Sequence, residues 1–370
     1  MKVTVAIVAA AASLPVLVSA QAAAWGQLLL LPRPKIVRTS TLYLNQPQPT
    51  PSTGAATCAG ATKFKYFGVN QAGAEFGSNT IPGNLGTHYA WPTTTSIDYF
   101  LGIGMNTFRI PFLMERLTPP AQGLTGDMDA TYLAALRKIA TYVTGKGGHA
   151  IIDPHNYGRY NGAIITDTAG FGTWCKKLAS EFQYDSNIIF DTNNEYHDMD
   201  QTLVFNLNQA CINGIRAAGA TSQLILVEGN SWTGAWSWVS SGNAASMIDL
   251  EDPNDNIAFE MHQYLDSDSS GTSENCVSST IGAERLTAAT NWLKQNEKKG
   301  FLGETGGGSN DACIAAVYGA LCHMQQAGGV WIGALWWAAG PMWGNYYQSI
   351  EPPNGISVSR ILPEALMPFV

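Results

Sequence analysis

The fold prediction for this chain starts from two stretches, IIFDTNNE at residues 188–195 and GFLGE at residues 300–304. Each is a run of apolar, β-branched or aromatic residues that leads to a glutamate, Glu195 in the first and Glu304 in the second. Such a run predicts a buried strand that delivers its last side chain to the edge of a sheet. In a parallel α/β barrel that edge is the C-terminal rim, where active sites are built. Two carboxylates on one rim are the minimum needed to cleave a glycosidic bond.

Six more runs of the same kind occur along the chain, and amphipathic stretches such as 130–144 and 281–295 lie between them. The eight strand candidates are 64–70, 107–112, 150–155, 188–195, 224–228, 257–264, 300–304 and 333–337. Strands that alternate with helices over roughly 300 residues predict a (β/α)8 TIM barrel. An open doubly wound sheet is the alternative, but no Gly-x-Gly-x-x-Gly turn follows the first strand candidate.

Composition narrows the class of partner. The 370 residues are enough for one large domain, the net charge is -8, and only 13% of residues are charged. An acidic protein lacks the basic face that nucleic acid or an anionic membrane requires, so we expect neither as partner. The 11 tryptophans suggest a carbohydrate ligand, because indole rings stack on the apolar faces of sugars. We expect a monomer that binds a carbohydrate; a polysaccharide substrate is implied only by the family resemblance given below.

The N-terminal part is expected to precede the barrel domain. Lys2, the apolar stretch 3–16 and the small residues near Ala20 predict a secretory signal peptide over 1–20, and hence an extracellular protein. Residues 21–45 have no assigned function. Trp25-Gly26-Gln27 resembles the start of a small fungal cellulose-binding module, but the segment lacks the cysteines whose disulfides hold such a module together. We therefore interpret residues 21–45 as a degenerate remnant of that module. Residues 46–62 form a Pro/Ser/Thr linker, and 63–370 form the catalytic barrel. No later segment is apolar enough to span a membrane.

Six cysteines in a secreted chain make disulfides plausible, and none of their spacings resembles a zinc site. Cys175 and Cys211 fall in helix-like stretches, where buried free thiols are an alternative. The pairing of these two, and of Cys58 and Cys322, stays open at this point.

Polar or aromatic side chains end six of the predicted strands. They are Arg109, His155, Asn194 with Glu195, His262 with Tyr264, Glu304 and Trp337. One polar strand end is ordinary, because a strand must emerge into solvent somewhere. Six that converge on one rim indicate a site.

These residues lie in motifs that resemble a known family. The motifs are FGVN (67–70), FRIP (108–111), DPHNY (153–157), NNEYHD (193–198), HQYLDSD (262–268), GETGG (303–307) and WWAAG (336–340). Over residues 63–365 the chain resembles glycoside hydrolase family 5, and within it the secreted fungal endo-β-1,4-glucanases (cellulases). The resemblance implies a retaining hydrolase with Glu195 as general acid/base and Glu304 as nucleophile. Tyr196 stands where most of the family has proline.

The resemblance also implies supporting roles. Arg109 and Tyr264 would hydrogen-bond Glu304, and Asn194 would reach the sugar 2-hydroxyl. His155 and His262 would position substrate and carboxylates, and Trp337 would be the sugar platform. Cys276 and Cys313 match a disulfide of the fungal group. Trp232 is equally compatible with lining the cleft and with packing, whereas packing is favoured for Trp236, Trp238 and Trp343, and a structural use for Glu228.

The alternatives left open are a β-1,4-mannanase on the same scaffold and a non-catalytic carbohydrate-binding barrel. His155 and His262 could also be core histidines with satisfied hydrogen bonds. A metal site is disfavoured because no His-Glu-x-x-His spacing occurs, and a serine hydrolase because no Gly-x-Ser-x-Gly occurs. We therefore expect an endo-β-1,4-glucanase that needs no metal or organic cofactor.

Overall fold

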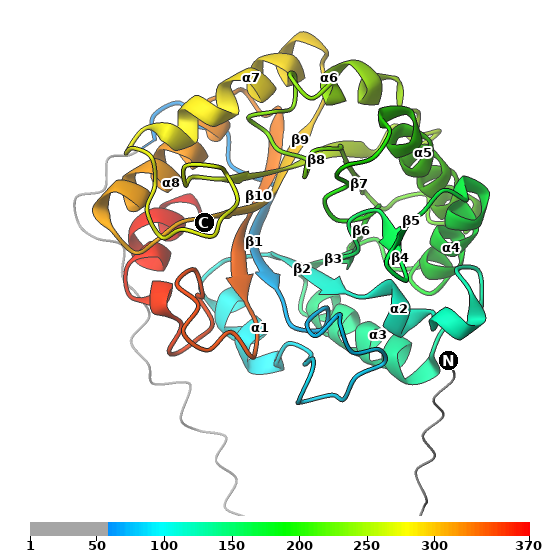
Figure 1. The fold of residues 1–370 in the computed structure, drawn as a ribbon. Helices are drawn as coiled ribbons and strands as arrows, with labels where there is room; N and C mark the ends of the chain where they lie inside the picture. The colour runs from blue at the N-terminus through cyan, green and yellow to red at the C-terminus, as the bar shows by residue number, and fades with distance from the viewer. Residues whose placement is uncertain (1–57) are drawn as a thin grey trace, which may run out of the picture. The chain divides into compact units, whose positions relative to one another are not determined.

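A computed structural model describes residues 58–370. The predicted signal peptide, the segment 21–45 and residues 46–57 of the predicted linker lie outside the described residues. Eight parallel strands close into a barrel in the order β1-β10-β9-β8-β7-β6-β3-β2, which confirms the predicted (β/α)8 fold (Figure 1). The strands are β1 (Tyr66–Gln71), β2 (Thr107–Phe112), β3 (His149–Pro154), β6 (Ile188–Asp191), β7 (Ile225–Glu228), β8 (Ile257–Tyr264), β9 (Gly300–Gly306) and β10 (Trp331–Ala339).

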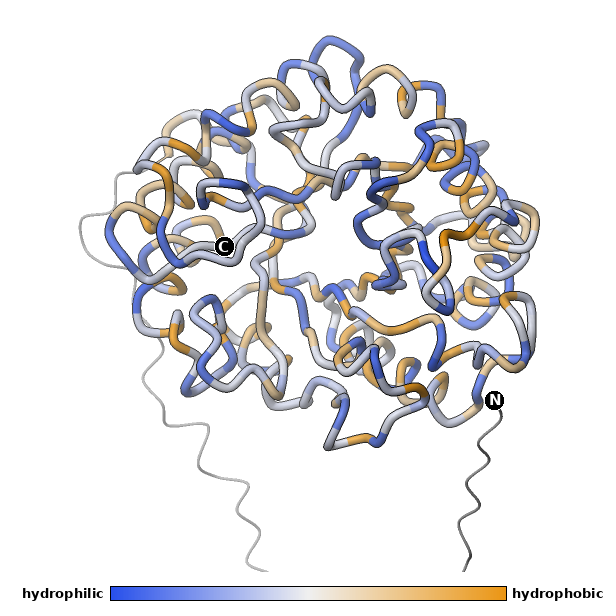
Figure 2. Tube along the Cα trace, in the orientation of Figure 1, coloured by the Kyte–Doolittle hydropathy of each residue, from blue (hydrophilic) through white to orange (hydrophobic). Residues whose placement is uncertain are grey.

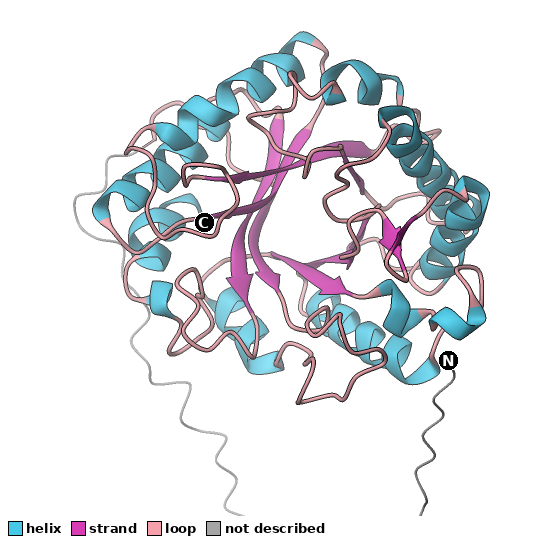
Figure 3. Ribbon diagram, viewed as in Figure 1, coloured by secondary structure: helices cyan, strands magenta, loops and turns pink. Residues whose placement is uncertain are grey.

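Helices surround the strands (Figure 3). They are α1 (Thr94–Gly102), α2 (Met114–Leu117), α3 (Ala130–Gly145), α4 (Thr168–Ser180), α5 (Gln201–Ala217), α6 (Asn243–Ser246), α7 (Ile281–Gln295) and α8 (Asp311–Gln325), with a small hairpin of β4 (Arg159–Tyr160) and β5 (Ala163–Ile164). Asp129, Asp167 and Asp200 cap α3, α4 and α5 by accepting a backbone N–H of the first turn. Hydrophobic and hydrophilic residues alternate within the turns of these helices, because one helix face packs on the barrel and the other faces solvent (Figure 2). No helix among the described residues is long and apolar enough to cross a bilayer.

Two layers fill the inside of the barrel. The first is a cluster of buried apolar side chains made by Tyr66, Ile151, Ile189, Leu224, Leu226, Ala258, Phe301 and Leu335. Two positions further along four of the same strands stand four buried carboxyl groups, Asp153, Asp191, Glu228 and Glu260. Side chains two residues apart point to the same side of a strand, so these carboxyl groups lie inside the barrel toward its C-terminal rim. The barrel therefore has an apolar floor beneath a polar layer.

Most predicted strand boundaries differ from the observed ones by one or two residues, and the largest difference is at the fourth barrel strand. This strand, β6, ends at Asp191, so Glu195 stands in the following loop rather than on the strand. Glu195 adopts a left-handed backbone conformation with φ of 48°. This conformation is uncommon for a residue with a Cβ and cannot continue a strand. Glu304, in contrast, lies within β9, which runs on to Gly306.

Three disulfides join the six cysteines. They are Cys58–Cys322, Cys175–Cys211 and Cys276–Cys313. The alternative of free thiols at Cys175 and Cys211 is wrong, because α4 and α5 pack side by side and bring the two sulfurs together. Residues 58–62, assigned above to the linker, are held against the barrel by the bond from Cys58 to α8.

Candidate active site

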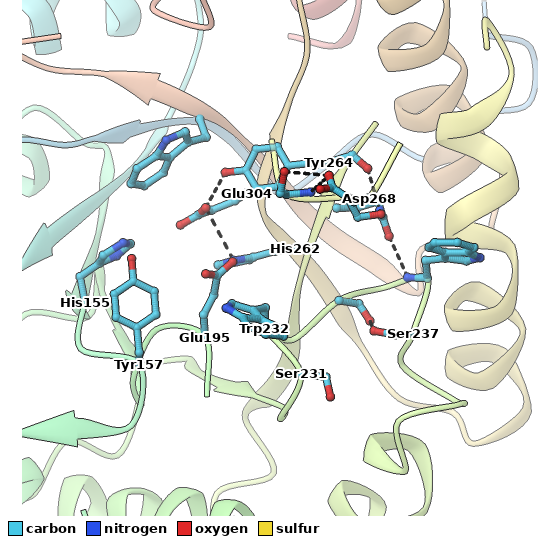
Figure 4. Close-up of a pocket in the computed structure, with 16 residues that line it drawn as sticks. His155, Tyr157, Glu195, Ser231, Trp232, Ser237, His262, Tyr264, Asp268 and Glu304 are labelled. Carbon is cyan, nitrogen blue, oxygen red and sulfur yellow. Dashed lines mark hydrogen bonds and ion pairs between the residues drawn. The ribbon is translucent and has the colours of Figure 1, made fainter. Parts of the chain in front are cut away.

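A cleft of about 760 Å³ opens at the C-terminal ends of the strands. Glu195, His262 and Glu304 lie on one side of it, and His155 and Tyr157 face them (Figure 4). The other lining residues are Ser231, Trp232, Gly234, Trp236, Ser237, Gln263, Tyr264, Asp268, Ser269, Ser270 and Trp337. The cleft thus combines two carboxylates with aromatic faces and small polar groups.

Glu304 is held at both of its oxygens. Arg109 donates from Nη1 to Oε1 at 2.8 Å, and the Tyr264 hydroxyl donates to Oε2 at 2.7 Å. The side chain is only 5% exposed. Burial by itself favours the neutral acid, but the charges of His262 and Arg109 and the bond from Tyr264 outweigh it and lower the pKa of Glu304. Glu304 is therefore an ionised carboxylate in a fixed orientation.

Glu195 is held mainly through its backbone. Its N–H donates to Glu228 Oε2 at 2.6 Å, and the N–H of Asn194 before it donates to the Pro154 carbonyl at 3.0 Å. The side chain has one hydrogen-bond partner among the described residues, His262, whose Nδ1 lies 2.9 Å from Oε1. It is 16% exposed, about three times the value for Glu304. The loop fixes the position of Glu195 while its carboxyl group stays open to the cleft.

The two glutamates are close enough to act on one bond. One carboxylate oxygen of Glu195, one of Glu304 and a ring nitrogen of His262 all lie within 4.8 Å of one another. A separation near 5 Å leaves no room for a water molecule between the carboxylates and a sugar carbon, whereas roughly 6.5–9.5 Å is needed for direct attack by water. The geometry fits one carboxylate that contacts the sugar carbon of a glycosidic bond directly and another that contacts its leaving oxygen.

Arg109 is the centre of the polar layer beneath the cleft. Its guanidinium contacts five carboxyl groups, those of Asp153 (2.9 Å), Asp191 (2.9 Å), Glu228 (3.2 Å), Glu260 (3.2 Å) and Glu304 (2.8 Å). It also donates to Oδ1 of Asn70 at 3.2 Å and to Oδ1 of Asn194 at 2.8 Å. Arg109 thereby orients Glu304 and Asn194 together.

One guanidinium cannot neutralise five buried carboxylates, so the protonation states must differ. Burial, followed by the charges of neighbouring carboxylates, raises the pKa of Asp191 and of Glu228 well above the ordinary range. For Asp153 burial acts in the same direction, but the charges of Arg109 and His155 outweigh it and lower the pKa. The surroundings therefore favour the neutral acid at Asp191 and Glu228 and the carboxylate at Asp153.

Two histidines, His155 and His262, lie beside these carboxylates, which raise the pKa values of both rings. Burial lowers the pKa of His262, but the charges of Glu304 and Glu228 outweigh it and raise that pKa well above its ordinary value. Burial likewise opposes protonation of His155, and Asp153, whose Oδ2 lies 2.8 Å from His155 Nδ1, raises the pKa. The neighbouring carboxylates therefore favour the charged form of both rings. Both histidines line the cleft, and their roles toward substrate stay predictions.

Trp337 and Asn194 complete the predicted set. The Trp337 ring stacks on His155 with 5.4 Å between centroids and lines the cleft. Asn194 is fully buried beneath the cleft. Its Nδ2 has no hydrogen-bond partner among the described residues, whereas its Oδ1 is held by Arg109. Nδ2 is thus a free donor beside the acid-bearing loop.

Trp232 and Trp236 line the far side of the cleft at 49% and 55% exposure. The packing role expected for Trp236 is therefore wrong; its ring lies over the Arg285 guanidinium at 4.8 Å. Trp232 has a left-handed backbone with φ of 54°, and its ring stacks on His197 at 4.5 Å. Packing was also expected for Trp238 and Trp343. Trp238 is fully buried, and the Trp343 ring packs against Trp337.

Sequence reasoning missed several members of the site. Asp191 and Glu260 were hidden inside apolar runs, although each stands two residues after a floor residue of its strand. Tyr157 was quoted only as part of a motif, and it lines the cleft opposite Glu195. The spacing of two along a strand is the signal that could have found the two acids.

Two groups of acids and histidine have metal-like spacing among the described residues, Glu195 with His262 and Glu304, and Glu228 with Glu260 and His262. The Arg109 guanidinium already contacts Glu304, Glu228 and Glu260. A second cation at either place would be repelled by the guanidinium. That the chain needs no metal stays a prediction.

Comparison with known proteins identifies the family of this chain. A family model described as cellulase (glycosyl hydrolase family 5) matches residues 69–340, the span that holds both glutamates and Arg109. The chain belongs to glycosyl hydrolase family 5. Family 5 membership agrees with the resemblance that the strand-end motifs indicated.

Named relatives of this family 5 chain cover most of its length. It is 55% identical over 319 residues to probable endo-beta-1,4-glucanase B of Neosartorya fischeri, a match that covers 86% of this chain and 95% of that protein. It is 52% identical over 339 residues to endoglucanase 3 of Humicola insolens, covering 85% of this chain and 86% of that protein.

Solved structures agree with the fold. XacCel5A in complex with cellopentaose has a TM-score of 0.79 and 38% identity, covering 83% of this chain and 99% of that one. Cel5A (EG2) from Hypocrea jecorina has a TM-score of 0.74 and 29% identity, covering 82% of this chain and 99% of that one.

Proposed function

We propose that this family 5 hydrolase is a secreted, retaining endo-β-1,4-glucanase that cuts internal bonds of cellulose and related β-glucans. The observation that carries the proposal is the pair Glu195 and Glu304, with carboxylate oxygens within 4.8 Å in an open cleft. The substrate class is supported by the relatives, which are named endo-beta-1,4-glucanases, and by the similar XacCel5A structure that holds cellopentaose.

In the first step Glu304 attacks the anomeric carbon and Glu195 gives its proton to the leaving oxygen. The bond to the leaving sugar breaks as the bond to Glu304 forms, which yields a covalent glycosyl-enzyme and a free chain end. Glu304 suits this role because Arg109 and Tyr264 hold it ionised and aimed. Glu195 suits the other role because its carboxyl group is more exposed and makes one side-chain contact, through which His262 orients it.

In the second step Glu195, now a carboxylate, removes a proton from water as the water attacks the anomeric carbon. Glu304 leaves with the electron pair of its bond, and the product keeps the β configuration of the substrate. The free Nδ2 of Asn194 is placed to donate to the sugar 2-hydroxyl, an interaction that strengthens as positive charge develops on the ring. Trp337 supplies an apolar face for the same sugar.

Secretion is part of the proposal. It is supported by the leader-like residues 1–20 and by three disulfides, which persist in oxidising compartments. We also propose that residues 46–57 are linker and that the enzyme acts as a monomer. Release of the processed protein into the culture medium, with a new N-terminus near Gln21, tests the first point; retention inside the cell contradicts it.

The test of the substrate is a comparison of initial rates on carboxymethylcellulose, mixed-linkage β-glucan and galactomannan. The glucanase assignment expects faster release of reducing ends from the first two. Faster release from galactomannan would make the chain a β-1,4-mannanase, and binding without release from any of them would make it a non-catalytic barrel. Proton NMR of the first product tests the mechanism, with the β-anomer expected and initial α-anomer contradicting it.

A further inference from the structure

Glu260 is a buried acid that the proposed mechanism does not use. It stands on β8 two residues before His262, so both side chains face the inside of the barrel. It is fully buried. Its Oε1 lies 3.2 Å from Arg109 Nε and 3.4 Å from His262 Nε2, so one oxygen contacts both side chains. Glu260 thereby connects the polar layer to the ring that lies beside both Glu195 and Glu304.

Strand β9 leaves room for this carboxyl group. The pairing of β8 with β9 shifts between Met261 and His262, and Gly303 is the residue of β9 that has no paired residue on β8. A Cβ on Gly303 would collide with Glu260 Oε1. The Glu260 carboxyl group therefore occupies the space of a side chain that β9 lacks, directly before Glu304.

The His262 ring has carboxyl groups on both sides. On one side, Nδ1 lies 2.9 Å from Glu195 Oε1 and 3.7 Å from Glu304 Oε2 (Figure 4). On the other side, Nε2 lies 3.4 Å from Glu260 Oε1, a long hydrogen bond, and 3.7 Å from Glu228 Oε1, which is too far for one. The hydrogen on Nε2 is therefore held by Glu260, and Nδ1 is the nitrogen that faces the cleft.

Under the proposed function, one negative charge moves past Nδ1 in each turnover. Glu304 is the carboxylate in the free enzyme, and it becomes an uncharged ester when its oxygen bonds the anomeric carbon. In the same step Glu195 gives its proton to the leaving oxygen and becomes the carboxylate. Since both glutamates have an oxygen within 3.7 Å of Nδ1, a positively charged ring faces one anion before and after the step.

The His262 ring has to keep its proton while these neighbours change. Burial opposes the charged ring, and the charge of Glu304 is the strongest contribution that favours it in the free enzyme. That charge is absent from the glycosyl-enzyme. If His262 then gave its Nδ1 proton to Glu195, the ring would be neutral and Glu195 would be an acid, unable to take a proton from water.

Several strands contribute to the surroundings of this proton. Besides Glu195 and Glu304 with its partner Tyr264, the charged or titratable side chains packed around the ring among the described residues are Arg109, Asp153, Glu228 and Glu260. Glu260 is the one that holds the ring nitrogen opposite the cleft. We propose that Glu260 is a positioning residue that keeps His262 charged in the glycosyl-enzyme, so that Glu195 remains the carboxylate that activates water. This inference rests on the proposed function.

Glu260→Gln isolates the charge of Glu260. Glutamine has the same length and an oxygen that accepts from Nε2, but it has no negative charge. The substrate is 2,4-dinitrophenyl β-cellobioside, whose leaving group departs without a proton. A burst of dinitrophenolate equal to the enzyme concentration verifies that hydrolysis of the glycosyl-enzyme limits kcat. On this substrate kcat therefore reports the step in which Glu195 acts as base.

The expected result is that kcat and KM both fall about 10-fold, because the glycosyl-enzyme accumulates when its hydrolysis slows. The ratio kcat/KM, which reports formation of the glycosyl-enzyme, should change less than threefold. A kcat within twofold of wild type would overturn the role of Glu260. A fall in kcat/KM as large as the fall in kcat would also overturn it, since the loss would then lie in the first step.

Nitrogen NMR of enzyme labelled with ¹⁵N-histidine tests the same inference in the wild type, without any substitution. Ring shifts separate a nitrogen that carries hydrogen from one that does not, and the signals of His262 are those absent from His262→Asn. At neutral pH both nitrogens should carry hydrogen in the free enzyme and in the enzyme trapped with 2,4-dinitrophenyl 2-deoxy-2-fluoro-β-cellobioside. In trapped Glu260→Gln only Nε2 should carry hydrogen, because removal of an anion lowers the pKa of the ring. A neutral ring in the trapped wild type, or a charged ring in the trapped variant, would overturn the inference.

Glu351→Gln is the matched control. Glu351 is also a partly buried acid, and its Oε2 accepts from the Gly340 N–H and the Ser96 hydroxyl, but it lines no part of the cleft. It should leave kcat and KM within twofold of wild type, and a loss equal to that of Glu260→Gln would contradict a specific role for Glu260. Wild-type enzyme that neither hydrolyses the cellobioside nor is labelled by its fluoro derivative would refute the proposed function itself. Labelled wild type with a neutral His262 ring refutes only the role of Glu260.

Discussion

Strand β9 and the loop after β6 each present one glutamate to the cleft, and they hold it in opposite ways. On β9, the Glu304 carboxylate is bonded at both oxygens and buried, while its backbone is ordinary strand. On the loop, the backbone of Glu195 is fixed in a left-handed conformation, while its carboxyl group has one partner and more exposure. Under the proposed function, the fold thereby supplies one glutamate that is ionised in the free enzyme and another that changes its protonation twice per turnover.

The largest effects should come from replacing either glutamate. Glu304→Gln should lower kcat on the order of 10⁵-fold for every leaving group, because no nucleophile remains. Glu195→Gln should cost roughly 10²–10⁴-fold on β-glucan, where the leaving sugar needs a proton. The measurement is kcat/KM for β-glucan and for 2,4-dinitrophenyl cellobioside.

The leaving group separates the two variants. Dinitrophenolate departs without a proton, so Glu195→Gln should form the glycosyl-enzyme from that substrate nearly as fast as wild type. Glu304→Gln should not. If the two variants responded alike to the leaving group, the different roles assigned to β9 and to the loop would be wrong.

Tyr264→Phe removes one of the two bonds that hold Glu304. The bond stabilises the ionised carboxylate, so its loss should raise the pKa of Glu304. Because the nucleophile must be ionised, the acid limb of the pH profile of kcat/KM should move to higher pH. Loss of a hydrogen bond to a charged group costs about 1.5–3 kcal/mol, or roughly 10- to 150-fold in rate. An acid limb that does not move would contradict the account of how Glu304 stays ionised.

A smaller effect should come from Glu228, which holds the loop. Glu228→Ala leaves the buried Glu195 N–H without its acceptor and should lower kcat about tenfold. Glu228→Gln keeps an acceptor, and since burial already raises the pKa of Glu228, the neutral amide should change kcat less than about threefold. The pair of variants is compared at one pH by steady-state kinetics. Equal losses from both would mean that the charge of Glu228, not its hydrogen bond, is what matters.

Much of the fold was predictable because the barrel strands carry β-branched and aromatic runs that end in turns. Helix α7 begins and ends where its periodicity predicted, and α3 is longer by one residue. The loop position of Glu195 was not predictable from the sequence. Residues 192–195 follow the apolar strand residues directly, with no turn signal between them. The backbone of Glu195 is held by a hydrogen bond to Glu228, which lies on another strand.

The polar layer was hidden for a different reason. In a strand buried on both faces, apolar residues point both inward and outward, so the pattern around Asp191 and Glu260 does not show which way they point until the inward-facing floor residues of the same strands are known. Cys175 and Cys211 could be paired only once α4 and α5 were seen to pack together. In each case the missing information lay in contacts between segments far apart in the chain.

The most direct test of the two roles is covalent trapping with 2,4-dinitrophenyl 2-deoxy-2-fluoro-β-cellobioside, which forms the glycosyl-enzyme but slows its hydrolysis. Intact mass should increase by one fluorocellobiosyl group, and peptide mapping should place that group on Glu304. A label on Glu195, or on any other carboxylate of the cleft, would contradict the assignment of Glu304 as nucleophile.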